Sequence, residues 1–194
     1  MNGTENYLLL RKKELPKTIP GYIIILMLAV MASFGIGYAF FSYFQPHALF
    51  RISLPVLGED YSSSAAALAR TKSGEILELL ILAVSSFTVF SKAAILLLCI
   101  LRGLSLGCVS ALYIAGLLSG SITGISGYIL FGFASAVIFA VLAAYSSVYS
   151  DCIVYSCASG ERKFAFALAR EYAVCFLTLS GGVLSVGIIP FIIL

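Results

Sequence analysis

Five apolar runs separated by polar stretches dominate the pattern of hydrophobic and polar positions along the chain. They cover Tyr22–Phe44, Ile76–Ser91, Ala93–Leu118, Tyr128–Val148 and Tyr172–Leu194. A helix that crosses a bilayer needs about 20 mostly apolar residues, and only the second run falls clearly short of that length. The pattern predicts an all-α, polytopic membrane protein with about five transmembrane helices, formed by residues 1–194 as a single helical membrane domain.

The second run, Ile76–Ser91, leaves more than one structure open. It either spans the bilayer with its ends snorkelling, or forms a re-entrant or tilted partial span. A third possibility is one long helix from Ile76 to Leu101. That helix would bury Lys92 together with Arg102, and two cations within hydrocarbon are costly. We therefore expect Lys92 to mark a turn between two helices.

The polar stretches between the runs differ in length and character. Residues 45–74 form a long polar connection on the outer side, in which Ser62–Leu68 is expected to form a short helix on the membrane surface. The small, glycine-rich segment 119–127 is typical of a tight outer turn. Residues 149–171 carry several charges and form the longest expected cytoplasmic connection.

The Lys and Arg residues indicate the orientation of this layout. Eight of them fall on one side of the predicted membrane, and three fall on the other. The first group comprises Arg11, Lys12, Lys13, Lys17, Lys92, Arg162, Lys163 and Arg170, and the second Arg51, Arg70 and Lys72. Cytoplasmic loops are enriched in such residues, so the sequence predicts a cytoplasmic N-terminus and an outer C-terminus. The first run is too long for a signal peptide, and no A-x-A-like cleavage site follows it.

Composition agrees with this class. The chain is 61% hydrophobic and 11% charged, with a mean hydropathy of +1.06, which leaves no room for a soluble domain. A net charge of +3 is too small and dispersed to indicate nucleic acid. The five cysteines show neither disulfide nor metal-ligand spacing, and we interpret them as small packing residues.

Arg102 is the strong charge that the sequence places within an apolar run. A guanidinium at bilayer depth costs between about 3 and 17 kcal/mol, so it needs a partner, a polar cavity or another protein. Glu78 lies about 13 residues from the predicted cytoplasmic turn and Arg102 about 10, which places them within roughly 5 Å in depth. The sequence predicts an intramembrane charge pair, which is either a structural ion pair or part of an anion or substrate site.

Small residues follow Arg102 at helical spacing. Gly103 and Gly107 are four residues apart, as are Gly116 and Gly120, and such spacing lets helix backbones approach closely in lipid. The predicted roles are helix packing within the chain or, alternatively, dimerisation. A matching small face on the fifth helix consists of Gly181, Gly182 and Gly187.

Motifs of catalysis are missing from the sequence. Its one histidine, His47, lies in the outer connection, whereas the cysteines lie in spans or near the cytoplasmic side. A Cys and His peptidase pair cannot form across the bilayer, and no H-E-x-x-H, phosphate loop or paired intramembrane aspartates occur. We expect no enzyme, no metal site and no cofactor.

The segment Ser91–Gly107 enters the membrane on a basic residue and carries Arg102 followed by Gly-x-x-x-Gly. It resembles the core of the stage II sporulation protein M family. The resemblance implies a non-catalytic scaffold of the bacterial cell membrane that assembles a peptidoglycan-remodelling complex with cell-wall hydrolases during sporulation. It further implies that Arg102, Gly103 and Gly107 serve packing and partner recognition.

Two functions therefore remain open for the chain. The favoured one is a membrane scaffold with membrane-associated protein partners, and the second is a small transporter or permease-like subunit that uses Arg102 in a polar cavity. A transporter needs a polar path at mid-depth. Beyond the charge pair, the spans offer mainly the hydroxyls of Ser85, Ser86, Thr88, Ser105 and Ser110.

Overall fold

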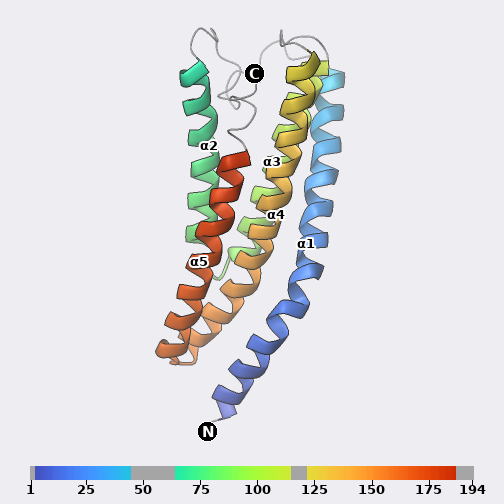
Figure 1. The fold of residues 1–194 in the computed structure, drawn as a ribbon. Coiled ribbons are helices and arrows are strands. Elements are labelled where there is room, and N and C mark those ends of the chain that lie inside the picture. Colours follow the sequence, from blue (N-terminus) through green and yellow to red (C-terminus); the bar gives the residue numbers. More distant parts are fainter. Residues whose placement is uncertain (1–2, 45–63, 115–121, 187–194) are drawn as a thin grey trace.

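Five helices account for nearly all of the chain that the computed structural model describes, which is residues 3–44, 64–114 and 122–186. They are α1 (Gly3–Phe44), α2 (Ser64–Ser85), α3 (Ser91–Ile114), α4 (Ile122–Ala158) and α5 (Arg162–Val186). Consecutive helices run in opposite directions and form an up-and-down bundle (Figure 1). The structure confirms the predicted all-α class with about five helices.

The helices share contacts unequally. α1 and α3 pack together most extensively, α4 lies against both, and α5 packs mainly along α4. α2 has more limited contacts with α3, α5 and α4. The main core cluster joins all five helices and includes Val30, Leu82, Cys99, Phe139 and Val183. α4 is therefore the central element on which the others assemble.

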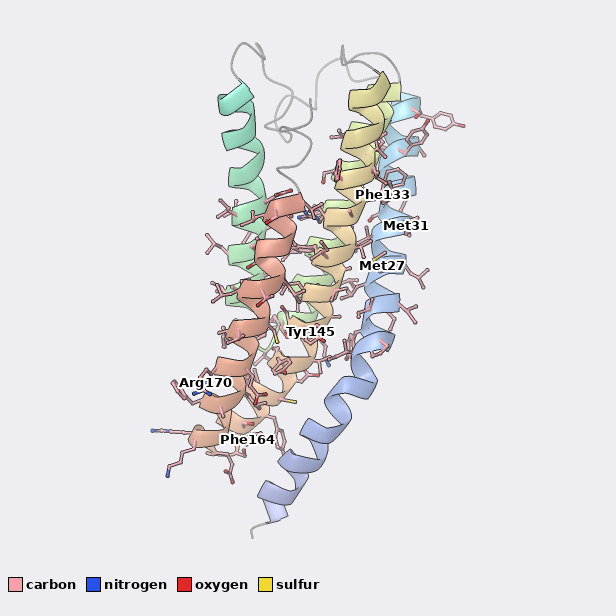
Figure 2. All side chains as sticks on the ribbon, in the orientation of Figure 1. Met27, Met31, Phe133, Tyr145, Phe164 and Arg170 are labelled. Atoms are coloured by element: carbon pink, nitrogen blue, oxygen red, sulfur yellow. The ribbon has the colours of Figure 1, made fainter. Side chains whose placement is uncertain are left out.

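Four of the described helices contain segments long and apolar enough to cross a membrane. These segments are Thr18–Tyr43, Ser91–Ala111, Ile129–Ala158 and Arg162–Val186. Large apolar side chains cover their outer surface, as with Leu28 (64% exposed) and Met31 (50%), which projects from α1 in Figure 2. Such a surface is unstable in water and suits lipid. The chain is thus a multi-pass membrane protein.

The second helix differs from the predicted span. It begins at Ser64 and ends at Ser85, and the turn to α3 occupies residues 86–90. The expected surface helix over residues 62–68 is, from Ser64 on, the beginning of α2. Lys92 lies in the first turn of α3 rather than in the connection, and the break at residues 86–90 excludes one continuous helix over 76–101. Four charged residues lie within α2.

The expected cytoplasmic connection over 149–171 is also helical for most of its length. α4 continues to Ala158, and α5 already begins at Arg162. Gly160 has a φ of 80°, the left-handed conformation typical of helix ends. The N–H of Glu161 donates to the carbonyl of Ser156 (3.0 Å), and that of Gly160 donates to Cys157 (3.2 Å). This pair of bonds satisfies the last carbonyls of α4 and reverses the chain within three residues.

A further difference concerns the glycine-rich segment 119–127, because residues 122–127 belong to α4. Residues 45–63, most of the expected outer connection, lie outside the described residues, as do residues 187–194 of the expected fifth span.

The up-and-down order gathers the basic residues. The beginning of α1, the α2–α3 turn and the α4–α5 turn lie at the same end of the bundle (Figure 1). All eight residues predicted on the cytoplasmic side lie in the beginning of α1 or within three helical turns of these two connections. The orientation of this end toward the cytoplasm stays a prediction.

Candidate functional site

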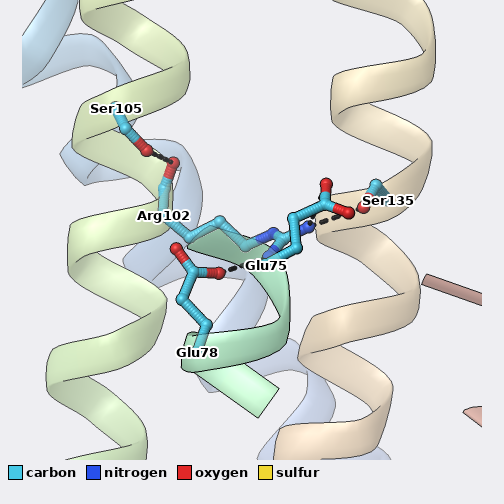
Figure 3. Close-up of polar contacts among 5 residues, drawn as sticks. All are labelled: Glu75, Glu78, Arg102, Ser105 and Ser135. Atoms are coloured by element: carbon cyan, nitrogen blue, oxygen red, sulfur yellow. Dashed lines mark hydrogen bonds and ion pairs between the residues drawn. The ribbon is translucent and has the colours of Figure 1, made fainter. Parts of the chain in front are cut away.

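Arg102 lies in the middle of α3, only 6% exposed, and its guanidinium points toward α2 and α4 (Figure 3). Nη1 donates a hydrogen bond to Oε2 of Glu78. Nη2 lies 3.6 Å from Oε1 of Glu75 and donates to the hydroxyl of Ser135 at 2.6 Å. The structure therefore joins the two residues of the predicted charge pair and adds two partners.

The local structure of α2 explains the second carboxylate. Glu75 and Glu78 are three residues apart, and residues at this spacing share one face of a helix. That face of α2 turns toward α3, so both carboxylates reach the same guanidinium. The i, i+3 spacing to Glu78 could have identified Glu75 as a second partner of Arg102. It was missed because Glu75 lies just before the second apolar run.

Two contacts come from α4. Ser135 accepts the Nη2 hydrogen bond, and one turn later the ring of Phe139 lies 4.7 Å from the guanidinium carbon. A cation over an aromatic face gains about 0.5–2 kcal/mol, most when both are shielded from water. No sequence signal distinguishes Ser135 from the many other serines of this chain. Arg102 thus connects α2, α3 and α4 through a single side chain.

The cluster places two carboxylates beside one guanidinium. The side chains of Glu75 and Glu78 retain 18% and 30% exposure, against 7% for that of Arg102. Arg102 Nε has no hydrogen-bond partner among the described residues. With Nη1 and Nη2 both engaged by protein groups, the arrangement is a polar cross-link between three helices.

The predicted packing glycines lie on another face of α3, against α1. A Cβ atom at Gly103 would collide with the carbonyl oxygen of Val30, and one at Gly107 would lie 2.8 Å from the backbone nitrogen of Tyr38. Only glycine permits this approach of the two backbones. Since α1 covers both glycines, they serve packing within the chain, and a partner protein cannot contact them without displacing α1.

The small surface opposite these glycines is on α1, not on α5 as the sequence suggested. From the α1 side, a Cβ at Gly37 would lie 2.5 Å from the carbonyl oxygen of Leu104, whereas one at Gly181 would meet nothing within 4 Å. Gly182 contacts Ile138 of α4. Gly116, Gly120 and Gly187 lie outside the described residues.

A second polar cluster lies near the α2–α3 turn. The hydroxyl of Ser86 donates to the carbonyl of Leu82 (2.7 Å) and accepts from the hydroxyl of Tyr172 (2.9 Å). Tyr172 has one proton to donate, so its 3.0 Å contact with Ser146 has Ser146 as the donor. This chain of hydroxyls ties α5 and α4 to the end of α2. Tyr172 was not singled out in the sequence because it begins an apolar run.

The beginning of α3 is fastened to α4 by two further contacts. Lys92 Nζ lies 2.9 Å from a carboxylate oxygen of Asp151, and Ser150 donates a hydrogen bond to Ser91 at 2.8 Å.

All five cysteines are free thiols. Within the described ranges, no three His, Cys, Asp or Glu residues lie close enough together to hold a metal ion. His47 lies outside those ranges.

Scans against protein-family models, curated proteins and solved structures each found no match for the chain.

Proposed function

We propose that the protein is a non-catalytic scaffold of a bacterial cell membrane. One observation carries this proposal. The buried guanidinium of Arg102 joins α3 to α2 and α4 by binding Glu78, Glu75 and Ser135. A binding site would leave the Nη donors directed at a ligand, whereas here both Nη groups are directed at side chains of neighbouring helices. The expensive charge therefore supports the architecture of the bundle.

The resemblance of Ser91–Gly107 to the stage II sporulation protein M family supplies the class of partner. We infer that the scaffold holds cell-wall hydrolases in a peptidoglycan-remodelling complex during sporulation. Because α1 covers Gly103 and Gly107, we expect such partners to bind outward-facing surfaces of the bundle.

A second candidate function, a small cation or proton transporter, is favoured by one feature of the same cluster. The carboxylates of Glu75 and Glu78 outnumber the guanidinium, stay partly exposed and belong to α2, which has limited contacts with its neighbours. If both carboxylates are ionised, the cluster carries one net negative charge that a cation or proton could neutralise.

Glu75→Gln separates the two functions, because the stronger Arg102–Glu78 pair remains and the fold should persist. The native protein is captured from membranes of its host after cross-linking, and the eluate is tested for glycan-degrading activity in a peptidoglycan gel. In parallel, the purified protein is reconstituted into liposomes that contain a pH-sensitive dye. A proton or sodium gradient is applied across the liposome membrane, and the dye reports the flux.

The scaffold predicts captured hydrolase activity with the native chain and with Glu75→Gln alike, and no flux above that of empty liposomes. Saturable flux that Glu75→Gln abolishes while thermal unfolding stays unchanged would replace the scaffold with the transporter. Capture of no glycan-degrading activity would remove the proposed partner class.

A further inference from the structure

One face of α5 changes its chemistry along the helix. Lys163, Phe166, Arg170, Val174 and Leu177 follow one another at intervals of three or four residues, which keeps them on a single face. All five are exposed, with Phe166 at 76%, Val174 at 62% and Leu177 at 70%. We call this set the α5 stripe. Its first part is basic and aromatic, and its second part is aliphatic.

The position of the stripe matches the boundary of a bilayer. Its aliphatic part lies beside the transmembrane bundle, whereas Lys163 and Arg170 lie toward the α4–α5 turn, which extends beyond the α2–α3 turn (Figure 1). Arg170 projects from the outer side of α5 in Figure 2. Seven residues of helix separate the two Cα atoms by about 10 Å along the axis. One headgroup layer is roughly 5–7 Å deep, and the long Lys and Arg side chains can reach into it from both positions.

The helix segments that reach this end of the bundle are basic. They contain eight basic and five acidic residues, which gives them a net charge of +3. The acidic residues are Glu5, Glu14, Asp151, Glu161 and Glu171.

The nearest carboxylates do not interrupt the stripe. At about 100° per residue, Glu171 lies roughly a quarter turn from the stripe, and Glu161 lies on the opposite side of the helix axis. Lys163 and Arg170 therefore face outward with no acidic residue on their own face of α5.

We propose that the α5 stripe binds an anionic phospholipid of the leaflet at this end of the bundle. Its phosphate lies between the side chains of Lys163 and Arg170, its glycerol region packs on Phe166, and its acyl chains follow Val174 and Leu177. Charge complementarity selects the occupant, because basic side chains at a headgroup layer attract anionic lipids and the adjoining aliphatic side chains suit the same molecule. A peptide partner would leave this aliphatic part facing hydrocarbon.

The test measures lipid binding to the purified protein in detergent by native mass spectrometry, with phosphatidylglycerol and phosphatidylcholine as probes. Each basic side chain near an anionic surface contributes about fivefold in affinity. Arg170→Gln should therefore weaken phosphatidylglycerol binding about fivefold, and Lys163→Gln with Arg170→Gln about 30-fold. Phosphatidylcholine binding should not change.

Arg162→Gln is the control for the loss of a charge from the same turn, since Arg162 lies about 80° around the helix from the centre of the stripe, whereas Lys163 and Arg170 lie within about 20° of it. It should change binding less than twofold. Equal binding of the two lipids by the native protein, or equal effects of Arg162→Gln and Arg170→Gln, would overturn the proposal. All of these side chains are exposed, and thermal unfolding of each variant checks that the bundle is intact.

Discussion

Two glycines of α1, only two residues apart, should respond to the same substitution in opposite directions. Gly37 is buried against α3, and an added Cβ would lie 2.5 Å from the carbonyl oxygen of Leu104 and 3.1 Å from its carbonyl carbon. Ordinary van der Waals contact begins near 3.4 Å, so α1 and α3 must separate by up to about an ångström. At Gly35, an added Cβ would meet nothing within 4 Å.

The magnitudes follow from these distances. Overpacking of a helix contact costs about 1–3 kcal/mol, and the upper part of that range, about 2–3 kcal/mol, applies here because the added Cβ meets backbone atoms of Leu104. Alanine returns about 1 kcal/mol of helix propensity relative to glycine. Gly37→Ala should therefore lower the free energy of unfolding by about 1–2 kcal/mol, whereas Gly35→Ala should leave it unchanged or raise it by up to about 1 kcal/mol. For a chain of this length, 1 kcal/mol shifts Tm by roughly 2–4 °C.

The assay is thermal unfolding of the two variants and the native protein in one detergent. Gly37→Ala should lower Tm by roughly 2–8 °C, with Gly35→Ala at or above the native value. Equal shifts for both variants would refute the reasoning, because they would show that the approach of α1 to α3 does not depend on the missing side chain.

Three other predictions concern the polar contacts and the orientation. Arg102→Ala leaves two partly buried carboxylates without their cation and should cost about 3–5 kcal/mol in unfolding experiments, and Glu78→Gln added to it should recover part of the loss; strictly additive effects would contradict the pair. Tyr172→Phe should cost about 1–2 kcal/mol, and Ser146→Ala on top of it less than about 0.5 kcal/mol, since its acceptor is already gone; a full second penalty would argue against the hydroxyl chain. In a cysteine-free background, Arg162→Cys should react with a membrane-impermeant maleimide only after permeabilisation, and labelling of intact cells would reverse the orientation.

The sequence predicts the apolar helices of this fold well and the polar helical segments poorly. Length and hydropathy located four apolar helices and the position of Arg102, because the bilayer imposes both constraints directly. The same reasoning failed where polar residues are helical. Residues 149–158 were predicted to be loop because they carry polar and charged side chains, yet Cys152 and Ile153 pack against Leu168 and extend the helix.

For the site, depth along the helices was enough to propose Arg102 and Glu78 as partners. Depth does not say how each helix is rotated about its own axis, and this rotation decides which side chains meet. Ser135 and Phe139 lie in α4, more than 30 residues from Arg102, and their contacts depend on the rotation of α4 about its own axis. The same missing information led to α5 rather than α1 as the partner of Gly103 and Gly107.

The described interior bears on function as well as stability. Lipid provides no hydrophobic drive to bring helices together, and this bundle instead uses buried hydroxyls, close glycine contacts between α1 and α3, and the cluster around Arg102. The hydroxyls of Tyr172 and Ser150, the α1–α3 glycines and the Nη groups of Arg102 each meet a neighbouring segment of the bundle. The basic and aliphatic side chains of α5 lie on the outer surface instead. This distribution is why we favour the proposed scaffold, which assembles partners, over a transporter that moves solutes through its centre.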